Sequence, residues 1–248
     1  MDIKTVAVIG AGVMGAQIAQ VFAASGYDVR LHDVRAEALP AALDRIENHR
    51  FGLRRGVERG KMTSADADAA IARITTTTDL ATACADVDMA IEVIFEDLML
   101  KMKVFREMDT LVPSHAILTS NTAGLPITAL AFATQQPERV LGWHWFQPCA
   151  VMRLAEVVVH PETDPELRDT IVAMARHCGK NAQVVKDDPL HWGFVGNRIN
   201  ARIRDEARTI VEQGLATKEQ VDVIMCDGFN WPIGPFGTRG DGVSLFQD

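Results

Sequence analysis

The sequence predicts an α/β protein, with a doubly wound, mostly parallel sheet followed by a small, shortened all-helical C-terminal domain. Three observations support this fold class. Short β-branched apolar runs alternate with segments of helical apolar spacing up to about residue 185. A glycine-rich turn joins the first apolar run to the first helical segment. Beyond about residue 185 the strand pattern stops and only helical spacing continues.

Each element is expected from its own residue pattern. The β-branched run at 4–9 has the composition of a buried parallel strand, and 27–32 is expected to be the second strand. Apolar residues at helical spacing between them predict a helix over 13–24. Further strands are expected at 89–94, 116–120, 140–145 and 152–159, and further helices at about 36–54, 64–72, 98–111 and 126–133.

The change of pattern divides the chain into two expected domains, 1–187 and 188–248. In the second domain one long helix is expected over 194–213. Its apolar positions form a single stripe at intervals of four, namely Val195, Ile199, Ile203, Ala207 and Val211. Exposure of that stripe would favour association with a second copy, so we expect a homodimer.

The composition is that of an ordinary globular protein. The chain has 248 residues, of which 48% are hydrophobic and 23% are charged. No apolar run approaches the roughly 20 residues of a membrane span, so no membrane partner is expected. The start of the chain runs directly into a strand pattern and leaves no room for a signal peptide.

The cysteines and the net charge exclude further classes. The four cysteines are widely scattered, which argues against a zinc site and a disulfide framework and favours a reducing cytoplasm. A net charge of −8 disfavours nucleic acid as a partner. One basic cluster, which includes Arg54 and Arg59, is either a solvated helix face or a site for an anionic small molecule.

The glycine turn has the context that dinucleotide binding requires. In the Gly10-x-Gly12-x-x-Gly15 pattern, Gly10 permits the tight turn, Gly12 lets a pyrophosphate approach, and Gly15 lets the helix pack on the sheet. The helix N-terminus offers free N–H groups to phosphate. Asp33 ends the second strand, 18 residues after Gly15, where a carboxylate binds ribose hydroxyls and repels a 2′-phosphate. The sequence therefore predicts a Rossmann-type domain that binds NAD.

Two titratable residues in the middle of the chain are candidates for chemistry. His144 lies at the end of a predicted strand, and Glu156 lies in an apolar strand where an unpaired carboxylate would be costly. Alcohol dehydrogenation without a metal needs a base with a pKa near neutrality, which histidine supplies. A partly buried carboxylate would orient the imidazole and stabilise its protonated form. A histidine between two tryptophans is also compatible with a packed core position.

Collinear motifs resemble those of the L-3-hydroxyacyl-CoA dehydrogenase family, which includes 3-hydroxybutyryl-CoA dehydrogenases. The resemblance runs from about residue 3 to 237. The stretches that carry it are VAVIGAGVMG at 6–15, SNT at 120–122 with LPIT at 125–128, HWFQP at 144–148, VMRLAEV at 151–157, GFVGNR at 193–198 and GPF at 234–236. It implies an NAD-dependent oxidoreductase of fatty acid metabolism that acts on a 3-hydroxyacyl thioester.

The resemblance also implies roles for individual residues. His144 would be the general base, Glu156 its partner, and Asn197 a substrate contact on the long helix. The helical second domain would serve substrate binding and dimerisation. The basic cluster at Arg54 and Arg59 would suit the phosphates of CoA. The cofactor contacts would be Gly10, Gly12, Val13, Met14, Gly15, Asp33, Glu96, Lys101, Asn121 and Gln147.

The chain departs from the family pattern at three places. Ala123 stands where the family usually has a serine that contacts substrate and cofactor, and losing such a donor costs on the order of 1–3 kcal/mol. Gln147 stands where the family has asparagine. The helical part is shorter than is usual. These changes leave two other functions open: an NAD-dependent dehydrogenase of a free or carrier-bound 3-hydroxy acid or sugar acid, and a catalytically silent NAD-binding or structural homologue.

Overall fold

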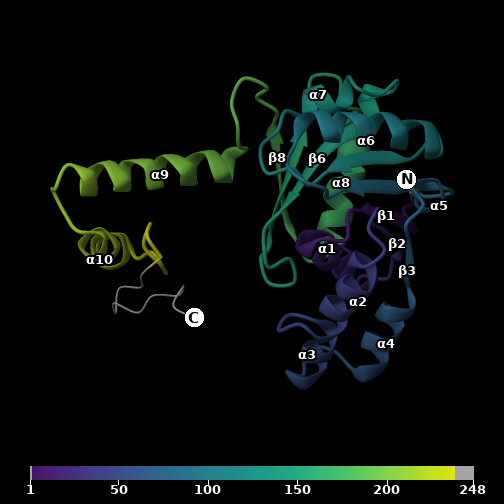
Figure 1. Ribbon diagram of the computed structural model, residues 1–248, viewed down its shortest axis with the longest axis horizontal. Coiled ribbons are helices and arrows are strands. Elements are labelled where there is room, and N and C mark those ends of the chain that lie inside the picture. The colour runs from purple at the N-terminus through teal and green to yellow at the C-terminus, as the bar shows by residue number, and fades with distance from the viewer. Residues whose placement is uncertain (1, 238–248) are drawn as a thin grey trace. The chain divides into compact units, whose positions relative to one another are not determined.

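The computed structural model describes residues 2–237. Within them, eight strands form one sheet in the order β3-β2-β1-β4-β5-β6-β7-β8 (Figure 1). The strands are β1 (Thr5–Ile9), β2 (Asp28–His32), β3 (Ile74–Thr77), β4 (Met89–Glu92), β5 (Ile117–Ser120), β6 (Val140–Trp145), β7 (Leu154–Val159) and β8 (Asn181–Lys186). All neighbouring pairs are parallel except β6 and β7, which are antiparallel. The predicted doubly wound, mostly parallel sheet is confirmed.

Helices connect the strands and cover both faces of the sheet (Figure 1). Those of the sheet region are α1 (Val13–Ala24), α2 (Ala38–Asn48), α3 (Leu53–Glu58), α4 (Ser64–Ala72), α5 (Leu80–Cys84), α6 (Leu98–Leu111), α7 (Ile127–Ala131), the 3₁₀ turn η1 (Pro137–Arg139) and α8 (Pro165–His177). The sequence predicted one helix over 36–54, but the structure has two, α2 and α3. The chain turns at Gly52, where an added Cβ would stand 2.7 Å from the carbonyl oxygen of Glu47.

Alternation along the strands builds one core on each face of the sheet. In β1, Val6 and Val8 pack in a cluster with residues of α1, α2, α4 and α8. Ala7 and Ile9 pack on the other face with residues of α5, α6 and α7. β1 lies between β2 and β4, so the chain leaves β1 toward one side and returns on the other. Such a switch point opens a crevice at the carboxyl ends of the strands.

The chain divides into two compact units, Met1–Phe194 and Val195–Asp248. The second unit contains α9 (Val195–Glu212) and α10 (Lys218–Phe229), in agreement with the predicted long helix. Helix α10 begins with a capping box in which Thr217 and Gln220 exchange hydrogen bonds. On α9, Ala207 is buried, whereas Val195 and Ile199 are exposed.

Among the helices that the structure describes, none combines the length and the apolar character that crossing a membrane requires.

Candidate active site

A cleft of about 640 Å³ opens at the carboxyl ends of the parallel strands. Among the described residues 2–237, those that line it belong to the first unit. The residues at the ends of β1, β2 and β5 reach it because parallel strands end at the same edge of the sheet. It brings together many of the residues that the sequence singled out, namely Gly10, Gly12, Val13, Met14, Asp33, Glu96, Lys101, Asn121 and Ala123.

The glycine turn forms the floor of this cleft. Gly10 has a φ of 113° and donates its N–H to the carbonyl oxygen of His32 at 2.7 Å. A Cβ on Gly15 would stand 1.8 Å from the carbonyl oxygen of Gly10, so the helix can pack this closely only with glycine. A Cβ on Gly12 would meet nothing within 4 Å. No side chain caps the N-terminus of α1, which leaves N–H groups for a pyrophosphate.

Asp33 is held firmly beside this turn. Its Oδ2 accepts a hydrogen bond from the Ala11 N–H at 2.9 Å, and its Oδ1 accepts one from the Arg35 N–H at 3.0 Å. The side chain of Arg35 lies 3.5 Å from the same carboxylate. The carboxylate is therefore fixed at the end of β2, where the ribose of a dinucleotide lies in this fold. Together, the open Gly12 position, the uncapped helix and this carboxylate fit NAD.

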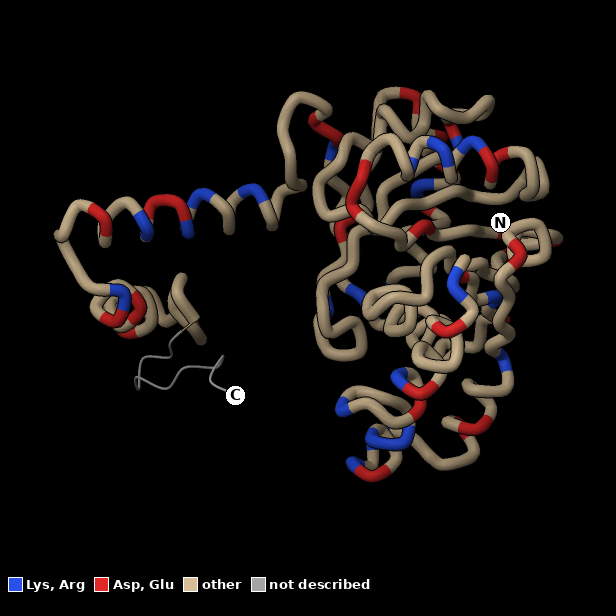
Figure 2. The backbone as a smooth tube through the Cα atoms, in the orientation of Figure 1, with Lys and Arg blue, Asp and Glu red and all other residues tan. Residues whose placement is uncertain are grey.

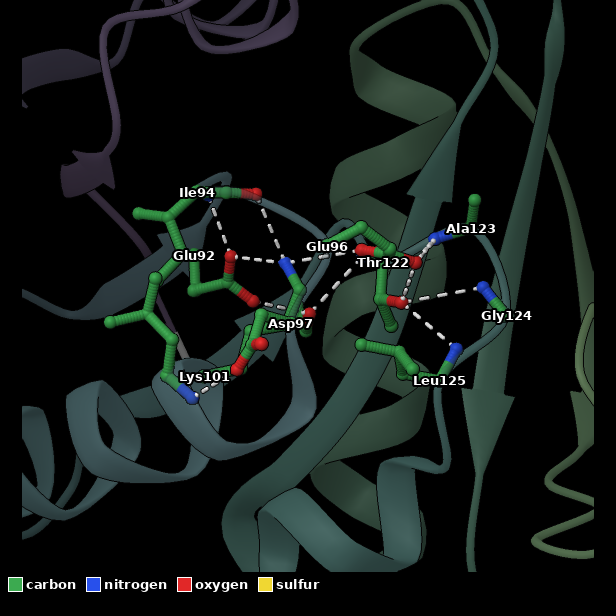
Figure 3. A network of polar contacts seen from close by, with 11 residues as sticks. Glu92, Ile94, Glu96, Asp97, Lys101, Thr122, Ala123, Gly124 and Leu125 are labelled. Carbon is green, nitrogen blue, oxygen red and sulfur yellow. Dashed lines mark hydrogen bonds and ion pairs between the residues drawn. The ribbon is translucent and has the colours of Figure 1, made fainter.

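A cluster of buried charges adjoins the cleft (Figure 3). The Lys101 ammonium is 2.6 Å from Glu92 Oε1 and 3.3 Å from Glu96 Oε2. Burial raises the pKa of Glu92, and the ammonium of Lys101 acts in the opposite direction. Glu92 was absent from the predicted site. Its signal in the sequence is a single charge at the end of an apolar strand, where burial demands a partner.

His144 and Glu156 form a pair between neighbouring strands. They are register partners of β6 and β7. The Nδ1 atom of His144 lies 2.8 Å from Glu156 Oε2, and the two side chains are only 6% and 3% exposed. Antiparallel partners place their side chains on the same face of a sheet. The geometry can therefore orient the ring and stabilise a positive charge on it, while Nε2 is the nitrogen that Glu156 does not engage.

Aromatic rings surround the imidazole of His144. The ring centroid of Phe146 lies 4.5 Å from that of His144, and the centroid of Phe194 lies 5.9 Å away. The next residue, Trp145, donates its N–H to Asn121 Oδ1 at 2.8 Å. Asn121 lines the cleft, so the end of β6 that carries His144 is tied directly to the cleft wall.

The loop after β6 is held by two residues that sequence reasoning missed. Gln17 accepts a hydrogen bond from the Cys149 N–H at 2.7 Å. Lys180 donates to the carbonyl oxygens of Cys149 and Met152, the latter at 2.8 Å, and its burial lowers its pKa. Both residues contact the backbone of a loop that is distant from them in the sequence. No local sequence motif therefore indicates their role. Gln147, at the start of this loop, is exposed and lies outside the residues that line the cleft.

The basic cluster lies on α3 and its end, away from the lining of the cleft. Arg54 donates to Asp68 at 2.6 Å and to Glu47 at 3.0 Å, so its charge is shared between two carboxylates. Figure 2 shows acidic and basic residues interspersed over this helical region. Arg59 is the C-cap residue of α3. Asn197 belongs to α9 in the second unit.

Comparison with known proteins gives one consistent family. The model of the 3-hydroxyacyl-CoA dehydrogenase NAD-binding domain matches residues 5–188, and the model of the C-terminal domain of the same family matches residues 193–241. A probable 3-hydroxybutyryl-CoA dehydrogenase of Bacillus subtilis is 40% identical over 235 residues, which are 95% of this chain and 79% of the relative.

Solved structures agree with this assignment. The 3-hydroxybutyryl-CoA dehydrogenase of Escherichia coli is 36% identical with a TM-score of 0.89, and the match covers 95% of this chain and 48% of that one. The (S)-3-hydroxybutyryl-CoA dehydrogenase of Ralstonia eutropha is 34% identical with a TM-score of 0.89, covering 95% and 81%. The chain thus spans about half of one relative and most of another. With its glycine turn, its fixed Asp33 and its matches to both domains, the chain belongs to the 3-hydroxyacyl-CoA dehydrogenase family and has its NAD-binding domain.

Proposed function

We propose that this protein oxidises the C3 hydroxyl group of a 3-hydroxyacyl thioester, with CoA as the carrier and NAD as the hydride acceptor. The substrate loses a proton from oxygen and a hydride from C3, and the products are a 3-ketoacyl thioester, NADH and a proton. The observation that carries this proposal is the buried His144–Glu156 pair, whose strand is tied through Asn121 to the NAD cleft. The names of the relatives supply the class of substrate.

The roles of the two residues follow from their contact. Nδ1 of His144 is held by Glu156, so Nε2 takes the hydroxyl proton while the carboxylate stabilises the imidazolium that forms. Bound NAD supplies the hydride acceptor. The aromatic rings beside His144 keep water from the imidazole and hold its plane.

The remaining site residues are assigned as part of the same proposal. Asp33 binds the ribose, and the amides of the Gly10–Gly15 turn bind the pyrophosphate. Glu96, Lys101, Asn121 and Gln147 serve the cofactor end. Residues 1–187 form the NAD domain and 188–248 the substrate and dimerisation domain. On the substrate side the proposed residues are Ala123, Asn197, Arg54 and Arg59.

A second candidate substrate is a free or carrier-bound 3-hydroxy acid. Two observations favour it: Arg54 is already bonded to two carboxylates, and Ala123 has no hydroxyl group to offer. An NAD-coupled screen separates the candidates by following NADH at 340 nm, the wavelength at which NADH absorbs, with 3-hydroxyacyl-CoAs beside free and carrier-bound acids. NADH formation with the CoA thioesters alone is expected. Turnover of free acids alone would replace the proposal with the second candidate.

Replacing His144 with Ala tests the mechanism. Removing the base should lower kcat by about two to four orders of magnitude, while the Kd for NAD stays within about twofold of wild type. The Kd is measured by fluorescence of bound NADH. A variant that keeps full activity would show that another group takes the proton. A wild-type protein that binds NAD but turns over no substrate in the screen would instead be a silent homologue.

We also propose a cytoplasmic homodimer. Cys84, Cys149 and Cys178 are buried free thiols, as suits a reducing compartment. Val195 and Ile199 leave an apolar surface exposed on α9 for a second copy. Light scattering during gel filtration should give twice the monomer mass of 27.1 kDa. A monomer mass would contradict the homodimer and leave the proposed chemistry untouched.

A further inference from the structure

The charged side chains of Glu96, Lys101 and Glu92 form a continuous chain of contacts (Figure 3). Glu96 and Lys101 line the cleft, whereas Glu92 lies behind them and does not. The side chain of Glu96 is 36% exposed, that of Lys101 is 1% exposed, and that of Glu92 is fully buried. An ammonium so deeply buried is tolerated only when it is paired and fully hydrogen-bonded.

Lys101 makes two hydrogen bonds and one further ion-pair contact through its ammonium. A lysine ammonium has three N–H groups and no acceptor. The three nearby acceptors are Glu92 Oε1 at 2.6 Å, the Ile94 carbonyl oxygen at 3.2 Å and Glu96 Oε2 at 3.3 Å. The two hydrogen bonds hold the ammonium on the side of Glu92 and Ile94. Its place in the cleft wall depends on the partners behind it.

Glu92 is built to hold that ammonium. Besides Lys101, it accepts a hydrogen bond from the Ser120 hydroxyl at 2.6 Å and one from the Ile94 N–H at 2.7 Å. All three of these partners are donors. The Ser120 hydroxyl of β5 holds Oε2 of this carboxylate, and the N–H of Ile94, just after β4, holds Oε1. The same Oε1 contacts the ammonium of Lys101.

Glu96 extends the chain of contacts to the next turn. Its Oε1 accepts a hydrogen bond from the Thr122 hydroxyl at 2.5 Å and one from the Ala123 N–H at 2.9 Å. The Thr122 oxygen in turn accepts the N–H of Leu125 at 3.0 Å (Figure 3). Glu96 is therefore stretched between Lys101 on α6 and the turn after β5, which contributes Asn121 and Ala123 to the cleft.

We propose that Glu92 is a positioning residue of the NAD site, which acts on the cofactor through the contacts of Lys101 and Glu96. Glu92 fixes the ammonium, the ammonium fixes Glu96, and Glu96 fastens the Thr122–Leu125 turn against the cleft. The proposal rests on the assignment of this cleft to NAD. It does not depend on which substrate the enzyme oxidises.

Glu92→Gln in the full chain tests the proposal, because it keeps the shape of the side chain and removes its charge. The Kd for NAD, measured by calorimetry without substrate, should rise about tenfold. At saturating NAD and substrate, kcat should change less than the Kd. An unchanged Kd in a folded variant would overturn the proposal.

Asp109→Asn is the matched control. Asp109 lies further along α6, where it forms a buried pair with Arg139 at 2.6 Å and lies outside the cleft lining. Its loss should lower the thermal midpoint, as loss of a buried pair does, and leave the Kd for NAD within about twofold. A similar Kd change in this control would mean that the Glu92 effect is only general destabilisation, and would overturn the positioning role.

A double-mutant cycle keeps the proposal testable even if Glu92→Gln folds poorly. Lys101→Met alone leaves the Glu92 carboxylate buried without its ammonium, whereas the double variant removes both charges. If Glu92 acts on the NAD site through Lys101, the double variant should bind NAD no more weakly than Lys101→Met. If the double variant raised the Kd by the product of the two single-variant factors, the proposal would be overturned. The cycle measures NAD binding without an acyl substrate. Its result therefore tests the role of Glu92 even if the screen finds no turnover of thioesters.

Discussion

At the scale of single residues, the buried charged groups of the first unit are secured by specific partners. Lys101 bonds to Glu92, and Lys180 bonds to two backbone carbonyl oxygens. Partners of this kind offset the cost of removing a charge from water. The imidazole of His32 has no such charged partner. It is 4% exposed, and both of its ring nitrogens are buried without a hydrogen bond.

His32 should make the stability of the protein depend on pH. Burial lowers its pKa below 6.5, although the backbone of Thr78 and the nearby carboxylates of Asp33 and Asp79 oppose the effect. Between pH 6.5 and the folded-state pKa, the unfolded chain binds more protons than the folded one. The contribution of His32 to the free energy of unfolding is therefore at its full value above pH 6.5. It decreases as the pH falls from 6.5 toward the lower pKa of the folded state.

His32→Leu should remove this dependence, because leucine fills the space without binding a proton. Urea denaturation at several values between pH 7.5 and pH 5 measures the free energy of unfolding. The variant should lose less stability than wild type on acidification. Equal slopes for the two proteins would show that other groups are responsible for the loss at low pH.

Site residues differ in how far sequence could find them. Asp33 and His144 end strands beside motifs, and Glu156 is a carboxylate in an apolar strand. The sequence did not indicate Glu92, Gln17 or Lys180, because each contacts a residue that only folding brings near it. Their partners are fixed by the crossing of strands and loops, which a local pattern does not contain.

At the scale of elements, strong periodicity was predictable and edge elements were not. The β6 strand and the long α9 helix match their predicted ranges closely. The strand β3, with sequence ITTT, has a single apolar residue, and β8 is mostly exposed, so neither shows a buried-strand pattern. Helix α8 was also missed, although its Asp164 cap and Pro165 are start signals for a helix.

The β1–α1 turn separates glycines needed for folding from those needed for ligand binding. Gly15→Ala places a Cβ against the carbonyl oxygen of Gly10 and should cost on the order of 3 kcal/mol of unfolding free energy. Gly12→Ala meets open space and should keep the thermal midpoint of wild type. Its methyl group should nevertheless weaken NAD binding about tenfold or more, because the pyrophosphate approaches there. Thermal denaturation and NAD titration of both variants check the contrast. Equal loss of stability in the two would contradict it.

At the scale of the whole molecule, the chain divides into a first unit that contains the sheet and a second unit that contains α9 and α10. The alternation of strands and helices predicted the sheet, but the strand order depends on pairing between segments distant in the sequence, such as β1 with β4. The sequence does not encode that pairing locally. Among residues 2–237, those that line the cleft lie before residue 195.

A chain cut to residues 1–194 should therefore still bind NAD. We expect a Kd within about threefold of the full chain, because no lining residue is lost. Oxidation of the acyl substrate should be abolished, since Asn197 and the rest of α9 are removed. Calorimetry measures the first property and NADH formation the second. A folded fragment without NAD affinity would show that the second unit contributes to the cleft.

The register between β6 and β7 limits where residues can be inserted or deleted in proteins of this family. His144 and Glu156 face each other because the backbone ladder sets them opposite one another. A deletion of one residue inside either strand would turn its side chain to the other face of the sheet. Insertions between Phe146 and Arg153 leave the ladder intact. Among natural relatives we therefore expect variation in length within that loop and none within the two strands, so that the His144–Glu156 pairing is preserved.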